Sequence, residues 1–172
     1  RQSSRAPRLS DGHGGDSRRR IPKPINTIQI MLRNQLSAAV ESAAQELGYG
    51  FRRGFEYRMG EVPIRFPAVW LVPPHVVRVE GREEGEIVYR ATLHLMRLDR
   101  RYDEQAKERQ WAEMERDALA MIGRIGKLQG IFCTGNIALT PAEFSLTRQG
   151  ELSMKAEFDA RLYFPNEPDD KP

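Results

Sequence analysis

The stretch ELSMKAEFDARLYF, residues 151–164, decides the fold because apolar side chains occupy every second position. Successive side chains of a strand point to opposite faces, so the pattern predicts a long strand with one buried and one polar face. The expected buried face comprises Leu152, Met154, Ala156, Phe158, Ala160, Leu162 and Phe164. The polar face is expected to carry Glu151, Ser153, Lys155, Glu157, Asp159 and Arg161.

Further strands precede this one. FRRGFEYRM (residues 51–59) alternates aromatic and polar side chains, and AVWLV (68–72) is an apolar run stopped by two prolines, typical of a strand covered on both faces. We expect helices on one of these faces and a neighbouring subunit on the other. VVRVE and GEIVYRATLHLMRL are expected to form a hairpin with a charged tip, and IFCTGNIAL and AEFSLTR to precede the last strand.

Two segments have the three-and-four spacing of amphipathic helices. The first runs from Asn26 to a stop at Gly48, and the second covers residues 103–128 with Trp111 and several methionines in its apolar stripe. The sequence therefore predicts an α+β fold, a mainly antiparallel sheet with two helices packed on one face. The expected order is α-β-β-β-β-α-β-β-β.

A chain of 172 residues with 40% hydrophobic and 30% charged residues suits one domain. Its single cysteine, Cys133, allows no intrachain disulfide and is expected to be a small buried residue. The absence of a long apolar run and of a secretory signal predicts a soluble protein without membrane contact.

The net charge of +3 is unevenly distributed. Residues 1–24 hold seven basic against two acidic side chains, which gives this segment +5 and leaves −2 for the remainder. Because residues 1–24 lack large apolar groups, we expect a disordered basic arm, followed by a single domain over 25–165 and a disordered acidic tail over 166–172.

Patterns of known catalytic chemistry are missing from the sequence. His13, His75 and His94 share no metal-ligand spacing, and no phosphate-binding glycine motif or nucleophile elbow occurs. We therefore expect no enzyme activity, no cofactor and no metal. Arg18, Arg19 and Arg20 of the arm are candidates for phosphate contact, but the first 24 residues contain no aromatic side chain for base stacking.

The order of elements over about residues 25–164 resembles that of the tail-terminator, or tail-completion, proteins of long-tailed bacteriophages and prophages. The similarity lies in TIQIMLRNQLSAAVESAAQELG, FPAVWLVPP, EGREEGEIVYRATLHLMRL, ERQWAEMERDALAMIGRI and TPAEFSLTRQGELSMKAEFDARLYF. The resemblance implies a non-catalytic virion protein of the tail, assembled in the bacterial host cytoplasm as a homo-oligomeric ring, commonly a hexamer. The implied partners are copies of itself and the tail-tube and head-connector proteins, and DNA would pass through the channel without specific binding.

An alternative function is a basic-armed binding module for nucleic acid or an acidic protein partner. In the ring hypothesis, the candidate interaction surfaces are the apolar strand, the hairpin tip and the polar face of the last strand. They comprise Val69, Trp70, Leu71, Arg82, Glu83, Glu84, Lys155, Glu157, Asp159 and Arg161.

Overall fold

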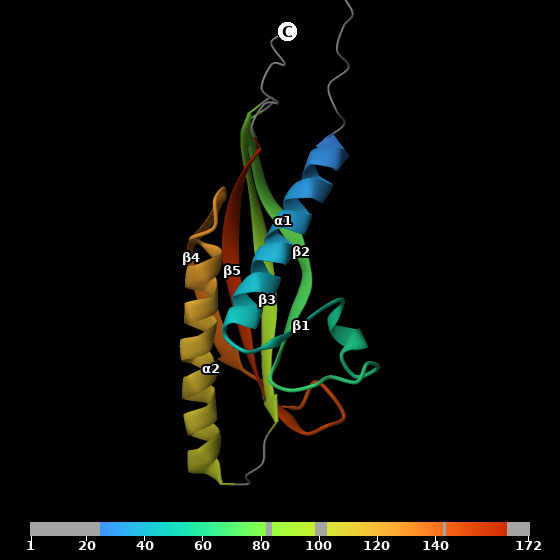
Figure 1. Ribbon diagram of the computed structural model, residues 1–172, viewed down its shortest axis with the longest axis vertical. Coiled ribbons are helices and arrows are strands. Elements are labelled where there is room, and N and C mark those ends of the chain that lie inside the picture. Colours follow the sequence, from blue (N-terminus) through green and yellow to red (C-terminus); the bar gives the residue numbers. More distant parts are fainter. Residues whose placement is uncertain (1–24, 82–83, 99–102, 143, 165–172) are drawn as a thin grey trace, which may run out of the picture.

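The computed structural model describes residues 25–81, 84–98, 103–142 and 144–164, without the side chains of 25–30 and 133–135. Within these residues the chain forms two helices and one sheet, so the predicted α+β class is confirmed (Figure 1). The elements are α1 (Ile25–Glu46), β1 (Gly50–Arg53), β2 (Ala68–Gly81), β3 (Gly85–Leu98), α2 (Glu104–Ile125), β4 (Ile131–Pro141) and β5 (Glu151–Phe164).

Specific residues fix the C-terminal end of α1 and the N-terminal end of α2. Gly48 has a φ of +78°, which favours glycine, and Tyr49 N donates a hydrogen bond to Ala44 O to close α1. Asp103 caps α2 by accepting a hydrogen bond from Gln105 N at 3.2 Å. Because α2 ends at Ile125, Leu128 lies beyond the helix and is exposed, outside the expected apolar stripe.

The sheet has the strand order β1-β2-β3-β5-β4 within the described residues. β1 runs parallel to β2, and the other neighbours are antiparallel. Both helices cover the same face, as expected, with α2 against β5 and β4 (Figure 1). The last strand, β5, therefore lies inside the sheet, between β3 and β4. This central position explains why every position on its helix-facing side is apolar.

The core lies between the helices and this face of the sheet. Met154, Ala156 and Phe158 of β5 stand opposite Leu95, Leu93 and Ala91 of β3, and all six side chains are completely buried. α1 and α2 contribute their apolar stripes to the same cluster. The predicted apolar face of β5 is confirmed, but the expectation that its polar face is open to water or a partner is wrong for Glu151, Ser153 and Asp159, which are buried.

The number of strands differs from the expected order because two predicted boundaries are wrong. AVWLV and VVRVE are one strand, β2, which continues through Pro73 and Pro74 with irregular pairing between Val72 and His75. Proline is tolerated at bulges and on edge strands, where no ladder donor is lost. β1 pairs with β2 only as far as Leu71, so these prolines interrupt no further ladder.

The segments FRRGFEYRM and AEFSLTR are not full strands. Of the first, only Phe51, Arg52 and Arg53 belong to a strand, β1, which pairs with β2. After Gly54 the chain turns into a short 3-10 helix, Glu56–Arg58. In the second, the described residues form a loop before β5. The carboxylate of Glu151 holds this loop by accepting hydrogen bonds from Leu146 N at 2.7 Å and Thr147 N at 2.8 Å.

Candidate interaction site

The polar face of β5 pairs its charges internally. Asp159 accepts hydrogen bonds from Arg90 at 2.8 and 3.1 Å and from Asn136 at 3.3 Å, and the Arg90 guanidinium holds the Asp159 pKa below its usual range. Lys155 and Glu157 form an ion pair at 3.0 Å. Arg161 Nε lies 3.1 Å from Glu86 Oε2, in an ion pair without hydrogen-bond geometry. The four predicted residues of this face, Lys155, Glu157, Asp159 and Arg161, are therefore each paired with an opposite charge of the same chain.

The apolar strand residues are not available to a partner. Val69, Trp70 and Leu71 have exposed fractions of 0%, 2% and 1%. Val69 and Leu71 belong to the helix-covered core, whereas Trp70 lies on the other face in a second cluster with Met59 and Ile64. The expectation of a neighbouring subunit over this second face is corrected, because the chain's own segment between β1 and β2 covers it.

The remaining predicted residues divide between the surface and the part of the chain outside the description. Glu84 is exposed at the tip of the β2–β3 hairpin. Arg82, Glu83, Arg18, Arg19 and Arg20 lie outside the described residues, so their predicted roles stay predictions.

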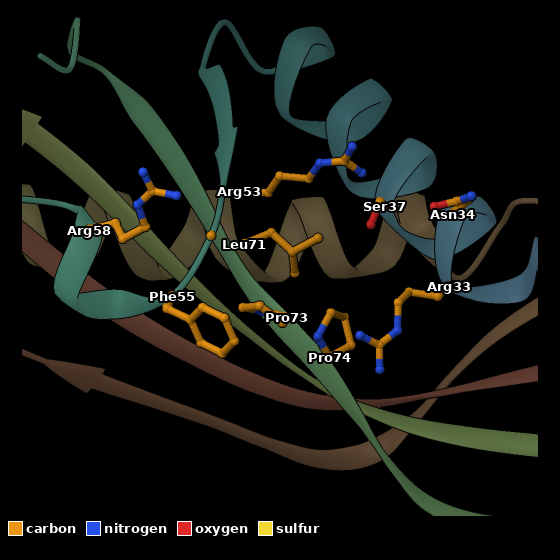
Figure 2. Close-up of a pocket in the computed structure, with 10 residues that line it drawn as sticks. Arg33, Asn34, Ser37, Arg53, Phe55, Arg58, Leu71, Pro73 and Pro74 are labelled. Atoms are coloured by element: carbon orange, nitrogen blue, oxygen red, sulfur yellow. The ribbon is translucent and has the colours of Figure 1, made fainter. Parts of the chain in front are cut away.

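A groove that was not predicted lies between α1 and the β1–β2 edge of the sheet (Figure 2). It has a volume of about 350 Å³. Leu71, Pro73, Pro74 and Phe55 supply its apolar lining. Its polar lining consists of Arg33, Asn34 and Ser37 from α1, Arg53 at the end of β1 and Arg58 in the 3-10 helix. A second hollow continues past Asn34, Ser37 and Arg53 to Arg52 and Glu41.

The groove has an excess of positive charge. Within the described residues, Arg53 forms no ion pair, and Arg58 is 3.6 Å from Glu61 in a surface pair that is exposed on both sides. The Arg33 guanidinium lies 6.0 Å from the centre of the Tyr89 ring, and burial raises the pKa of Tyr89 although Arg33 opposes the shift. Three guanidinium groups beside an apolar floor can bind a carboxylate or another anion.

The turn beside the groove presents two aromatic rings to solvent. Phe55 and Tyr57 stack with ring centres 5.9 Å apart, and their exposed fractions are 57% and 72%. Between them, Glu56 points back to the sheet, where its carboxylate lies 2.8 Å from His94 Nε2. This contact anchors the turn, and large exposed aromatics beside arginines are typical of binding surfaces.

The sequence contains a signal for this groove that strand periodicity hides. In FRRGFEYR, arginines alternate with aromatics, which favours a strand, but Gly54 interrupts the segment and frees Phe55 and Tyr57 from the sheet. Arg33, Asn34 and Ser37 belong to α1, so their meeting with Arg53 depends on tertiary packing and not on spacing in the sequence.

Metal-ligand clusters and membrane-spanning helices are absent from the described part of the chain. It contains no group of three or more histidine, cysteine, aspartate or glutamate side chains placed to hold a metal ion. None of its helices is long and apolar enough to span a membrane. Comparison with models of known protein families found no match, and neither did comparison with curated protein sequences.

Proposed function

We propose that this chain is a structural subunit of a bacteriophage or prophage tail, a terminator or completion protein that forms a ring at the head-proximal end of the tail tube. It acts without catalysis. The proposal rests on the resemblance in element order and on one structural observation, the open edge of β2. Its implied partners are further copies of the chain, the tail-tube protein and the head connector, and DNA passes through the ring without specific binding.

The open edge of β2 supports self-association. β1 pairs with β2 only along Ala68–Leu71, so the strand from Val72 to Gly81 has a described neighbour on one side only. Val76, Val77 and Val79 on this segment have exposed fractions of 37%, 48% and 47%. An unpaired strand with apolar side chains is a template for pairing with another chain. If this edge contacts a different surface of the next copy, and the rotation between copies closes, the contact builds a ring.

The test is the oligomeric state of the purified full chain across concentration, by native mass spectrometry and light scattering, with electron microscopy to show a ring with a channel. We expect a closed oligomer, commonly a hexamer. Val77→Lys combined with Val79→Lys should yield monomers, because two charges then oppose pairing at this edge. Leu119→Lys, at a 51% exposed position on α2, is the matched control and should leave the oligomer intact.

Two outcomes count against the proposal. A monomer at every concentration, including in the presence of tail-tube protein, contradicts a ring. A closed oligomer that survives both valine substitutions contradicts the role of the β2 edge and removes the structural support.

A second candidate function is a basic-armed binding module, and the arginine groove is the observation that favours it, since it extends positive charge from the arm to the folded body. Removing residues 1–24 tests this function. Loss of nucleic-acid binding with an intact oligomer supports it, whereas unchanged binding or no binding by the full chain at low salt contradicts it.

A further inference from the structure

The arginine groove has the chemistry of a site for an acidic polypeptide segment. Guanidinium groups form paired hydrogen bonds with carboxylates, and Arg33, Arg53 and Arg58 line one hollow from different sides, with their guanidinium groups pointing in different directions (Figure 2). Pro73, Pro74 and Phe55 provide an apolar floor between them, whereas Leu71 is only 1% exposed. Such a floor suits a segment in which acidic residues alternate with prolines or other apolar groups.

The surroundings favour a polypeptide over a nucleic acid. Glu41 lines the adjoining hollow and Glu61 lies at Arg58, and their negative charges repel phosphates and carboxylates alike. Peptide segments can also add to the open β2 edge through backbone hydrogen bonds, a mode that nucleic acids lack. The groove lies where that edge begins, at Leu71 and Pro73.

This chain contains a segment whose charge is opposite to that of the groove. Residues 165–172, PNEPDDKP, carry Glu167, Asp169 and Asp170 against one lysine, and three of the eight residues are proline. The opposite terminal segment, residues 1–24, is basic and would be repelled by the arginines. Of residues 1–24 and residues 165–172, only the acidic segment is opposite to the groove in charge.

The geometry of β5 favours a segment from another copy. Phe164, the last residue of β5, stands opposite Gly85, and Gly85 stands opposite Gly81 at the hairpin tip. Pro74 is seven residues before Gly81 on β2, which places the groove about 20 Å back along the sheet and two strands across. Glu167 follows Phe164 by three residues, a reach of about 11 Å, and Asp170 could arrive only through a fully extended chain that reverses at Phe164.

We propose that the groove lined by Arg33, Arg53 and Arg58 receives the acidic segment 165–172 of a second copy of this chain. The carboxylates bind the arginines, the prolines contact Pro73 and Phe55, and the contact joins neighbouring subunits. The inference deepens the proposed function, because it names the contact by which copies of the chain associate.

The first experiment measures binding of the segment itself. A fluorescently labelled PNEPDDKP peptide is titrated by anisotropy into the full chain, in which Glu167→Gln, Asp169→Asn and Asp170→Asn remove competition by the chain's own segment. We expect saturable binding that weakens with salt and falls at least about tenfold with Arg53→Glu, equivalent to about 1.4 kcal/mol. Arg109→Glu, at an exposed position on α2, is the matched control and should not change the affinity.

The second experiment measures assembly of the full chain by native mass spectrometry. Arg53→Glu should weaken the oligomer, because it replaces one of the three attracting charges of the groove with a repelling one. Arg53 is exposed, so unchanged circular dichroism is expected for its variant.

The outcomes separate the inference from the proposed function. If the wild-type chain forms rings but Arg53→Glu neither loosens them nor lowers peptide affinity, the inference is wrong and the proposed function stands. If the wild-type chain is monomeric at every concentration, including in the presence of tail-tube protein, both the ring and the contact between copies are contradicted, even if the peptide binds in an Arg53-dependent manner. Arg53-dependent binding of single-stranded DNA without peptide binding overturns the inference in favour of a nucleic-acid site.

Discussion

The Tyr49 hydroxyl donates a hydrogen bond of 2.8 Å to Asp117 Oδ2 and so joins the turn after α1 to the middle of α2. Arg97 of β3 contacts both groups, at 2.9 Å from the Tyr49 hydroxyl and 2.6 Å from Asp117. Burial and the bond to Asp117 raise the pKa of Tyr49 to about 12 although Arg97 opposes the shift. The network connects both helices to the sheet.

Removing Asp117 should destabilise the fold strongly. Asp117→Ala leaves the Tyr49 hydroxyl and the Arg97 guanidinium without their buried partner, and we expect a loss of about 2–4 kcal/mol in the free energy of unfolding. Chemical denaturation measures this loss. Glu115→Ala, at an exposed position of the same helix, is the control and should change stability by less than about 0.5 kcal/mol. Equal effects of the two variants would contradict the structural role of the network.

The raised pKa of Tyr49 also predicts how stability responds to alkali. Between its ordinary pKa of 10.0 and its folded value of about 12, the unfolded chain releases a proton that the folded chain retains. The wild-type protein should therefore lose stability in this interval. Tyr49→Phe should flatten that part of the profile, and denaturation at several alkaline pH values checks it. An unchanged slope in the variant would show that Tyr49 does not carry the dependence.

Glu151 should make stability sensitive to acid. Burial alone raises its pKa, but hydrogen bonds from Thr147, Ser145 and the backbone outweigh burial and hold it below its ordinary value. The stabilisation is present above the ordinary pKa of 4.5 and is lost as pH falls through the lower folded value. Glu151→Gln should cost about 1–3 kcal/mol at pH 7 and reduce the acid dependence, measured by denaturation between pH 7 and pH 3. A variant as acid-sensitive as the wild type would contradict this assignment.

Substitution by alanine should have opposite effects on stability at Gly54, which Trp70 packs against, and at Gly123. Gly54 has a φ of +153°, and a Cβ there would lie 3.0 Å from Trp70 Cζ2, while Trp70 Nε1 donates a hydrogen bond of 2.6 Å to Gly54 O. Gly54→Ala should destabilise the protein by about 1–2 kcal/mol. Gly123→Ala in α2 meets nothing within 4 Å and should stabilise it by about 0.5–1 kcal/mol. Thermal unfolding distinguishes them, and a stabilised Gly54→Ala would contradict the close approach.

The alternation of apolar and polar residues predicted the central strands, because each face of these strands carries side chains largely of one kind. Phe158 of β5 was expected on the buried face, and it stands opposite Ala91 of β3 in the core. At the edge of the sheet, prolines and a glycine led to wrong predictions of where the strands end. Pro73 and Pro74 do not end β2, because an edge strand needs no donor on its free side.

The candidate site depended on packing that has no periodic signal. Arg33 belongs to α1 and Arg53 to β1, and only the folded arrangement brings them to one groove. Trp70 illustrates the same limit: AVWLV correctly indicated a strand buried on both faces, but the identity of the second cover, Met59 and Ile64 of the chain itself, follows from a turn at Gly54 that local alternation conceals.

The contact between His94 and Glu56 predicts a pH dependence at the turn that borders the groove. His94 is only 4% exposed, and its burial lowers its pKa although Glu56, at 2.8 Å, and Glu157 oppose the shift; Lys155 adds to it. Below its ordinary pKa of 6.5, the unfolded chain binds a proton that the folded chain resists, so stability should fall as pH drops from 7.5 to 5.5. Glu56→Gln removes the carboxylate that favours the protonated ring and should steepen this fall. Denaturation at the two pH values, with the His94 ring followed by NMR, measures both effects. A shallower fall in the stability of Glu56→Gln would show that the carboxylate does not support the protonated histidine. The turn carrying Phe55 and Tyr57 would then be anchored by the packing of Met59 and Trp70 instead.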